Sequence, residues 1–362
     1  MFSIYQELKR CHQDGVRGVL GTIISTEGSS YQKVGAKCFI SEDGIITGLV
    51  SGGCVESDLK EHAASVLQTG RGTIVHYNFQ DENDLIWGLG LGCNGKITIL
   101  LEPFLPVQQP ETTESLVAAF SLMQSHSLCI VKVIDAKSSS FISEQWLINL
   151  DHIDTSIIPY QDVVVDLHRQ LCHRQSVLST VRGGNDVRIF YDFTTPPPHL
   201  VIFGAGPDAI PLVQIAQSLK WNVELVDHRL SHLEQEVFSS VVKKTHYAAG
   251  RFPTVEITTN SYVIVMTHNF LQDQVILQEI INMNVAYIGL LGPRKRMKEL
   301  LKTDIYSDKQ QLIHSPVGLD IGSKTPEEIA LSILAEIMLV YRGGTGRKLS
   351  EVKKESESLL SL

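Results

Sequence analysis

Two glycine-rich segments in the first third of the chain each carry a cysteine and could hold an anionic or metal-containing ligand. The first is Ser51-Gly52-Gly53-Cys54-Val55-Glu56, after which apolar residues recur at helical spacing. A strand that turns through glycines into a helix directs backbone N–H groups at an anion. The helix dipole lowers the pKa of a thiol at that end, so Cys54 is a candidate thiolate. A tight turn around a buried cysteine is the alternative.

The second segment is Gly90-Leu91-Gly92-Cys93-Asn94-Gly95, preceded by Gly88. Its glycines would let a loop press its backbone against a bulky, planar ligand, with Cys93 as the candidate contact. A purely structural loop is the alternative. Spacing alone leaves open whether Cys54 and Cys93 face a common pocket.

A third candidate site lies in the second half of the chain, at Gly204-Ala205-Gly206-Pro207-Asp208-Ala209. It matches G-x-G-x-x-A between a strand and a helix, and Asp227 ends the next predicted strand. In such a site Gly204 and Gly206 admit a diphosphate to the helix N-terminus, and Asp227 accepts a hydrogen bond from a ribose, which favours NAD over NADP. Pro207 removes a backbone donor and Asp208 adds negative charge, so a Rossmann domain without its nucleotide is the alternative.

Two further segments follow predicted strands of the same half, and ligands bind at the carboxyl ends of such strands. His268, in Thr267-His268, is either an acid, base or ligand contact or an exposed loop residue. The run Arg294-Lys295-Arg296 either holds a phosphate or forms a solvated helix face, and we favour the solvated face.

The elements that must position the first two segments lie before residue 195. A helix is expected over residues 3–13, with a capping box of Ser3 and Gln6. Strands are expected at residues 18–25, 73–79 and 97–101, with a hairpin at 37–50. Residues 106–195 carry no chemical motif, and they either complete the first sheet or form a separate subdomain. Pro196-Pro197-Pro198 predicts a stiff boundary.

After that boundary, apolar strands alternate with helical patterns, which is typical of a doubly wound parallel sheet. The last helix has a clear start, with Thr325 as N-cap, Pro326 at the first helical position and Glu328 closing a capping box. The predicted fold class is therefore α/β: an N-terminal α+β domain over residues 1–195, followed by a Rossmann-like doubly wound parallel sheet over residues 199–349.

Composition narrows the possible roles of the chain. Its 362 residues are 43% hydrophobic, enough for a full core, and the net charge of -9 argues against a nucleic-acid partner. No apolar run is long enough to span a membrane and the N-terminus lacks a secretory pattern, so we expect a cytoplasmic protein. The remaining cysteines are widely spaced and are expected to be small buried hydrophobes: Cys11, Cys38, Cys129 and Cys172.

Taken together, these motifs resemble the XdhC/CoxI family, the xanthine dehydrogenase accessory proteins. The N-terminal match runs through Gly28-Ser29-Ser30-Tyr31, the segment Gly48–Glu56 and Gly90-Leu91-Gly92-Cys93. The C-terminal match runs through the Rossmann turn, Asp227-His228-Arg229, Thr267-His268, the segment Tyr287–Gly292 and Thr325-Pro326-Glu327-Glu328-Ile329-Ala330.

The resemblance implies a protein that binds the molybdenum cofactor and delivers it to apo-xanthine dehydrogenase or a related molybdoenzyme of purine catabolism, with no turnover of its own required. Cys54 becomes the first candidate contact, as a ligand of thiophilic molybdenum, and Cys93 the second. Beside Cys54, the matching residues are Ser51, Gly52, Gly53 and Glu56. A cysteine desulfurase and further copies of the chain are candidate partners.

Two other functions remain open at this point. An NAD(P)-dependent oxidoreductase would use the Rossmann turn, Asp227 and His268, the one proton-transfer group identified. A sulfurtransferase would act through a persulfide on Cys54. A bound pterin or molybdenum would favour the cofactor-binding role, and a bound nicotinamide would favour the oxidoreductase.

Overall fold

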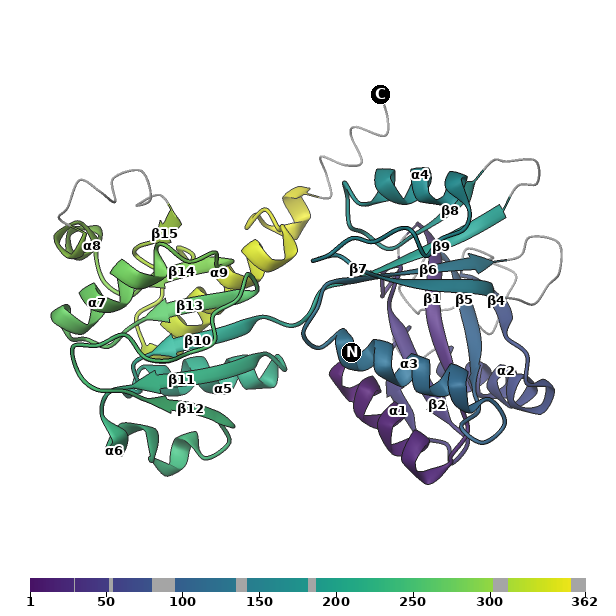
Figure 1. Ribbon diagram of the computed structural model, residues 1–362, viewed down its shortest axis with the longest axis horizontal. Coiled ribbons are helices and arrows are strands. Elements are labelled where there is room, and N and C mark those ends of the chain that lie inside the picture. The colour runs from purple at the N-terminus through teal and green to yellow at the C-terminus, as the bar shows by residue number, and fades with distance from the viewer. Residues whose placement is uncertain are drawn as a thin grey trace. The chain divides into compact units, whose positions relative to one another are not determined.

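The computed structural model describes residues 1–28, 30–51, 55–79, 95–134, 142–181, 187–301 and 312–352. The chain divides into two compact units, Met1–Pro196 and Pro197–Leu362 (Figure 1). Each unit has hydrophobic clusters of its own. The predicted α/β class is confirmed, with antiparallel sheets in the first unit and a parallel sheet in the second.

A five-stranded antiparallel sheet is central to the first unit, and its spatial order is β3-β2-β1-β5-β4. Its strands are β1 (Gly18–Gly28), β2 (Lys37–Ser41), β3 (Ile46–Gly48), β4 (Thr73–Asn78) and β5 (Gly95–Phe104). Because side chains alternate along a strand, Val19 and Ile23 bury one face against helix α2 (Glu56–Thr69), whereas Leu20 lies on the other face.

Residues 106–195 add a second antiparallel sheet to this unit, in the order β7-β6-β9-β8. Its strands are β6 (Leu128–Ile134), β7 (Ile142–Asn149), β8 (Val177–Val181) and β9 (Val187–Thr194). Helices α3 (Pro110–Leu122) and α4 (Gln161–Gln170) accompany it, and α1 (Phe2–Asp14) packs against α3 and against β2 and β3 of the first sheet.

Two buried ion pairs join the two sheets. Lys37 on β2 lies 2.7 Å from Asp192 on β9, and both side chains are only 1% exposed. Lys132 on β6 lies 2.6 Å from Glu102 on β5. Because a buried charge without a partner is costly, these pairs fix which residues of the two sheets face each other.

Two local expectations for this unit were wrong. Helix α1 has Met1 at its N-cap with no side-chain cap, and Ser3 lies inside the helix, because the chain begins its helical turn before Ser3. Cys172 is exposed, since it lies in the turn after α4, where its Sγ is 3.8 Å from the carbonyl oxygen of His168. Cys11, Cys38 and Cys129 are buried as predicted.

The second unit is built on a parallel sheet with the order β12-β11-β10-β13-β14-β15. Its strands are β10 (His199–Phe203), β11 (Asn222–Asp227), β12 (Lys243–His246), β13 (Ser261–Val265), β14 (Tyr287–Leu290) and β15 (Ile313–His314). The described strand pairs of this sheet are all parallel, and the order reverses between β10 and β13. This is the doubly wound arrangement that the alternating pattern predicted.

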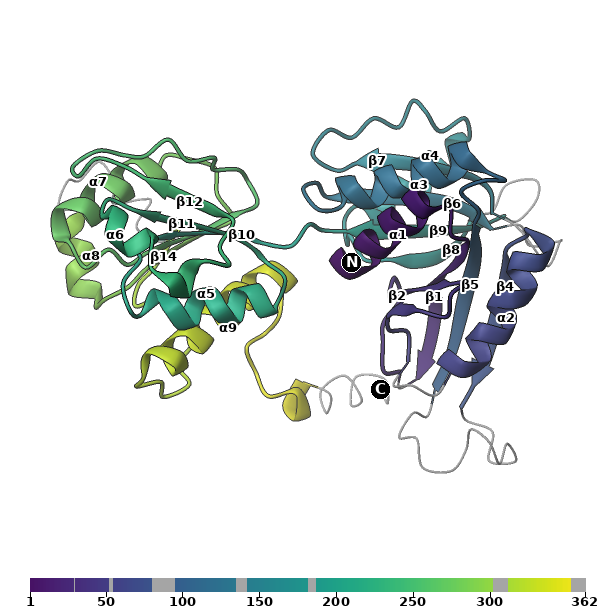
Figure 2. The same cartoon turned by 90° about the horizontal axis from the view of Figure 1, so that it is seen from below.

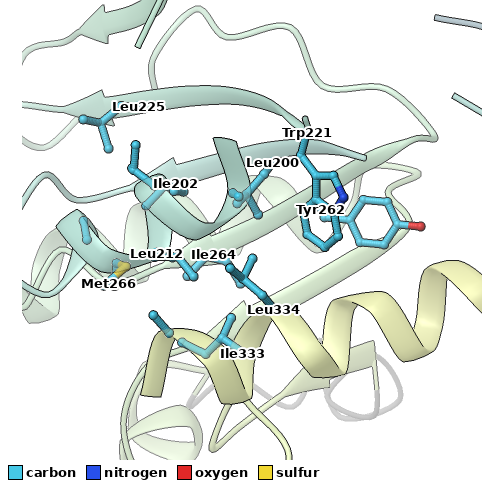
Figure 3. Packing of buried hydrophobic residues seen from close by; sticks show 14 of the residues in the cluster. Leu200, Ile202, Leu212, Trp221, Leu225, Tyr262, Ile264, Met266, Ile333 and Leu334 are labelled. Atoms are coloured by element: carbon cyan, nitrogen blue, oxygen red, sulfur yellow. The ribbon is translucent and has the colours of Figure 1, made fainter. Parts of the chain in front are cut away.

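Helices cover both faces of this sheet, as the apolar strands require (Figure 2). Helices α5 (Ala209–Ser218) and α9 (Pro326–Arg342) pack on one face, where residues of both helices join the cluster drawn in Figure 3. Helices α7 (Phe270–Ile280) and α8 (Arg294–Leu300) cover the other face. Short helices α6 (Leu230–Leu233) and η1 (Glu236–Phe238) lie between β11 and β12.

Candidate functional site

The motif segments of the first unit leave from one end of the five-stranded sheet. Gly28, the last residue of β1, pairs with Gly95, the first residue of β5. Phe79, just after β4, donates its backbone N–H to the carbonyl oxygen of Gly95 at 2.9 Å. The segment from Gly28 onward and the segment that links β4 to β5 therefore begin side by side.

Helix α2 brings the first glycine–cysteine segment to this same end. The Tyr77 hydroxyl on β4 donates a 2.6 Å hydrogen bond to Asp58 in the first turn of α2. On the other side of the segment, buried Ser51 accepts the backbone N–H of Val55 through its Oγ, at 3.3 Å. The start of α2 is thus held against the end of β4, shortly before the second segment begins. The described residues that flank the two segments therefore lie at the same end of the sheet.

The central residues of both segments lie outside the described part of the chain. These are Gly52, Gly53 and Cys54 of the first segment and residues 80–94, with Cys93, of the second. The side chain of Glu56 is likewise not described. Within this predicted set, Ser51 is the residue whose side chain is described, and the roles of all its members stay predictions.

In the second unit, the predicted residues gather at the carboxyl ends of β10, β11 and β13. Gly204 has φ of +121°, and a Cβ there would stand 2.4 Å from the carbonyl oxygen of Met266, so only glycine fits this crossing of two strand ends. Across the same point, His268 Nε2 lies 2.7 Å from Asp208 Oδ2. His268 itself has a positive φ of 58°, which is uncommon for a residue other than glycine.

The Asp227 carboxylate is buried and fully engaged within the chain. Oδ2 accepts the backbone N–H of Ala205 at 2.7 Å and Arg229 Nη2 at 2.8 Å. Oδ1 accepts the backbone N–H and the Nε of Arg229, at 2.8 and 3.0 Å. Burial alone would raise the pKa of Asp227, but the hydrogen bonds from Arg229 and Ala205 outweigh it, so the pKa is lowered.

The sequence did not predict a buried hydrogen-bond network that lies beside His268 in the chain. Asp273, 1% exposed on α7, accepts the Thr267 hydroxyl at 2.5 Å and Arg296 Nη2 at 2.7 Å. Arg296 is thereby a structural partner, whereas Arg294 and Lys295 are exposed on α8, as favoured for that run. In the sequence, Thr267 and Asp273 are six residues apart, and this spacing alone did not predict the network.

Comparison with known proteins agrees with both units. A model of the XdhC and CoxI family matches residues 11–78, and a model of the XdhC Rossmann domain matches residues 200–337. A curated relative from Bacillus subtilis, named as a probable xanthine dehydrogenase subunit, is 31% identical over 329 residues, which cover 90% of this chain and 94% of the relative. The chain belongs to the XdhC and CoxI family.

Two further relatives support this family assignment. The molybdenum cofactor insertion chaperone PaoD of Escherichia coli is 21% identical over 330 residues, covering 90% of this chain and 84% of that protein. A crystal structure described as a xanthine dehydrogenase from Bacillus halodurans matches with a TM-score of 0.73 and 30% identity, over 96% of this chain and 97% of the other. The XdhC-type fold thus extends over nearly the whole chain.

Two features were sought in the described residues of this XdhC-type chain: a metal-binding cluster of side chains and a membrane-spanning helix. Within the ranges given above, no three His, Cys, Asp or Glu side chains are grouped so that they could hold a metal ion. No helix of those ranges has the length and apolar character needed to cross a bilayer.

Proposed function

We propose that this XdhC-type chain binds the molybdenum cofactor and serves in the maturation of a xanthine dehydrogenase or a related molybdenum hydroxylase. Its role is to hold and transfer the cofactor, with no turnover of its own required. The name of the relative PaoD, a molybdenum cofactor insertion chaperone, supports cofactor binding. The name of the Bacillus subtilis relative supports a xanthine dehydrogenase as the client.

The proposal is supported by the described residues that flank the two glycine–cysteine segments, which lie at one end of the five-stranded sheet. Gly95 is the last residue of the second segment, and the Tyr77–Asp58 hydrogen bond holds the start of α2 against β4, the strand paired with β5. A ligand at this end would meet groups from both segments at once. Cys54 and Cys93 could then both contact that ligand.

The residues at this end fit the chemistry of the proposed cofactor. Cys54 lies just ahead of α2, a helix of 14 residues, whose N-terminal N–H groups and dipole favour a thiolate or a phosphate. A thiolate is a suitable ligand for a soft metal centre such as molybdenum, and the pterin of the cofactor carries a phosphate. In this proposal Cys54 contacts the metal centre, Ser51, Gly52, Gly53 and Glu56 surround it, and Cys93 approaches from the second segment.

The partners follow from the same role. The client is the apo form of the molybdoenzyme, and a cysteine desulfurase would supply sulfur for a sulfurated cofactor. We also expect the chain to form a homo-oligomer in the cytoplasm. The alternative function, an NAD(P)-dependent oxidoreductase that uses Gly204, Gly206, Asp227 and His268, is supported by the Rossmann strand order alone and not by the already paired Asp227.

The test is the identity of the small molecule that the full chain carries. The protein would be purified from a host that makes the molybdenum cofactor, then denatured, and the released compounds analysed by mass spectrometry, with bound molybdenum measured on the same sample. Pterin and molybdenum in near-equal amounts are expected. A nicotinamide nucleotide without pterin would overturn the proposal in favour of the oxidoreductase. Protein from a host unable to make the cofactor is the control.

A further inference from the structure

The glycine turn after β10 is filled by the chain's own carboxylate. Asp208 is the N-cap of helix α5, the place where a Rossmann domain receives the diphosphate of its nucleotide. Its Oδ1 lies 2.7 Å from the point where a Cβ on Gly206 would stand. The carboxylate therefore folds back over the turn, and Gly206 is needed to make room for Asp208.

The position of Asp208 is fixed from the neighbouring strand. Its Oδ2 lies 2.7 Å from His268 Nε2, and His268 belongs to the loop after β13. Its Oδ1 is buried and has no hydrogen-bond partner among the residues that the structure describes. The pair spans the point where the strand order reverses, which is where a dinucleotide crosses the sheet edge in this fold.

The position that a ribose would occupy is blocked by a second ion pair, between Asp227 and Arg229. A Rossmann acid selects its nucleotide by accepting a hydrogen bond from a ribose hydroxyl. Here both oxygens of Asp227 accept from Arg229, which reaches them through its Nε and Nη2 in a forked arrangement. The backbone N–H groups of Ala205 and Arg229 take up further acceptor capacity, so a ribose would have to displace the guanidinium.

From these two pairs we infer that the Rossmann crevice excludes dinucleotides with a diphosphate bridge, NAD and NADP alike, and that Asp208 and Arg229 are the residues that determine this specificity. A diphosphate would meet the Asp208 carboxylate at the helix N-terminus, where the two negative charges repel. Its ribose would find Asp227 already paired. The fold is that of a nucleotide-binding domain, but these residues do not fit the nucleotide.

The inference is tested by titrating the full chain with NAD, NADP and ADP-ribose in a calorimeter. For the wild-type chain we expect dissociation constants weaker than about 1 mM for all three. Asp208→Asn removes the charge with little change in size, and Arg229→Ala frees the carboxylate of Asp227. The double variant should bind NAD at least about tenfold more tightly than the wild type.

Two outcomes of these titrations would contradict the exclusion of dinucleotides. Micromolar binding of NAD or NADP by the wild type would overturn the inference. So would a double variant that melts as a folded protein and still fails to bind, because the exclusion would then lie elsewhere. Asp208→Asn alone is measured too, since it keeps Arg229 on the buried Asp227. Glu279→Gln removes an exposed carboxylate at the far end of α7 and should leave the titration unchanged.

Discussion

The Tyr77 hydroxyl donates a 2.6 Å hydrogen bond to the Asp58 carboxylate, and this contact ties the end of β4 to the first turn of α2. Tyr77 is 8% exposed, and the same carboxylate oxygen of Asp58 lies 3.4 Å from His62 Nε2. Both glycine–cysteine segments adjoin this contact in the chain. We therefore expect a change at this contact to affect both segments.

We expect Tyr77→Phe to lower the free energy of unfolding by about 1.5–3 kcal/mol, because a hydrogen bond to a charged acceptor is lost in a largely buried place. Cofactor retention should fall with it, since the start of α2 is no longer held against β4. Urea denaturation and bound molybdenum are the measurements. Tyr160→Phe is the matched control, because Tyr160 donates to Glu144 on the surface and its loss should change little. Equal effects of the two substitutions would contradict this account.

The buried pair of Lys37 and Asp192 allows a second prediction. Asp192→Asn should destabilise the first unit by about 3–5 kcal/mol, because the Lys37 ammonium would stay buried without its counter-charge. The melting temperature and the urea midpoint report the change. Glu27→Gln breaks an exposed pair with Lys96 and should alter neither appreciably. If both variants melt like the wild type, the Lys37–Asp192 pair does not hold the two sheets together.

Stability should also depend on pH through Asp227 and Glu224. The pKa of Glu224 is lowered, because hydrogen bonds from His199, Lys243 and Thr245 outweigh the effect of burial, and the pKa of Asp227 is lowered likewise. A carboxyl with a lowered pKa in the folded state contributes stability above the unfolded value of about 4, and this is lost as the pH falls through the folded value. Urea midpoints should therefore decrease below about pH 4. Asp227→Asn should make this decrease smaller, and an unchanged pH profile would contradict the assignment.

The sequence predicted the local features of this chain better than the contacts between distant residues. The capping box of α9 was predicted in full: Thr325 accepts the N–H of Glu328, and the Glu328 side chain returns to the Thr325 backbone, because all the partners lie within one turn. The Asp208–His268 pair joins residues 60 positions apart and depends on how β10 and β13 align, which no spacing reveals. The same holds for the Tyr77–Asp58 contact, which joins β4 to α2.

The sequence predicted the candidate site only as two separate glycine–cysteine segments. Composition and glycine spacing pointed to Cys54 and Cys93 separately. That the residues flanking the two segments lie at one end of the sheet follows only from the pairing of Gly28 with Gly95 and the packing of α2 on the sheet. Residues 106–195 gave no pattern that distinguished a second sheet from a subdomain, since short antiparallel strands carry little periodicity. Which of the two forms depends on pairing between strands that are far apart in the sequence.

Two cysteines of the first unit, Cys54 and Cys38, should respond differently to the same substitution. Cys54→Ser should leave the fold intact and reduce the retained molybdenum by roughly tenfold, about 1.4 kcal/mol, because a serine hydroxyl stays protonated and is a poor ligand for a soft metal. Cys38→Ser should instead lower the stability by about 1–3 kcal/mol, since Cys38 is fully buried on β2 and a hydroxyl there loses its hydration.

Cofactor retention and melting temperature would be compared for both variants, with Cys172→Ser, at an exposed position, as the neutral control. A Cys54→Ser protein that melts early and still carries its cofactor would make Cys54 a core residue. Cofactor binding would then need a different contact, and Cys93→Ser is the next variant to measure.

The second unit should fold when separated from the first. A fragment of residues 199–349 keeps the whole parallel sheet and the clusters on both of its faces, so we expect a soluble protein with cooperative melting. A fragment that starts at Pro197 is the matched comparison. It keeps two hydrogen bonds, from Asn260 Nδ2 to the Pro197 carbonyl and from the Asn222 N–H to the Pro198 carbonyl, both at 3.1 Å. Each contributes about 0.5–1.5 kcal/mol, so the longer fragment should unfold at a higher urea concentration. If both fragments are insoluble or melt without cooperativity, the parallel sheet does not fold as an independent domain, and the boundary at Pro196-Pro197-Pro198 is wrong.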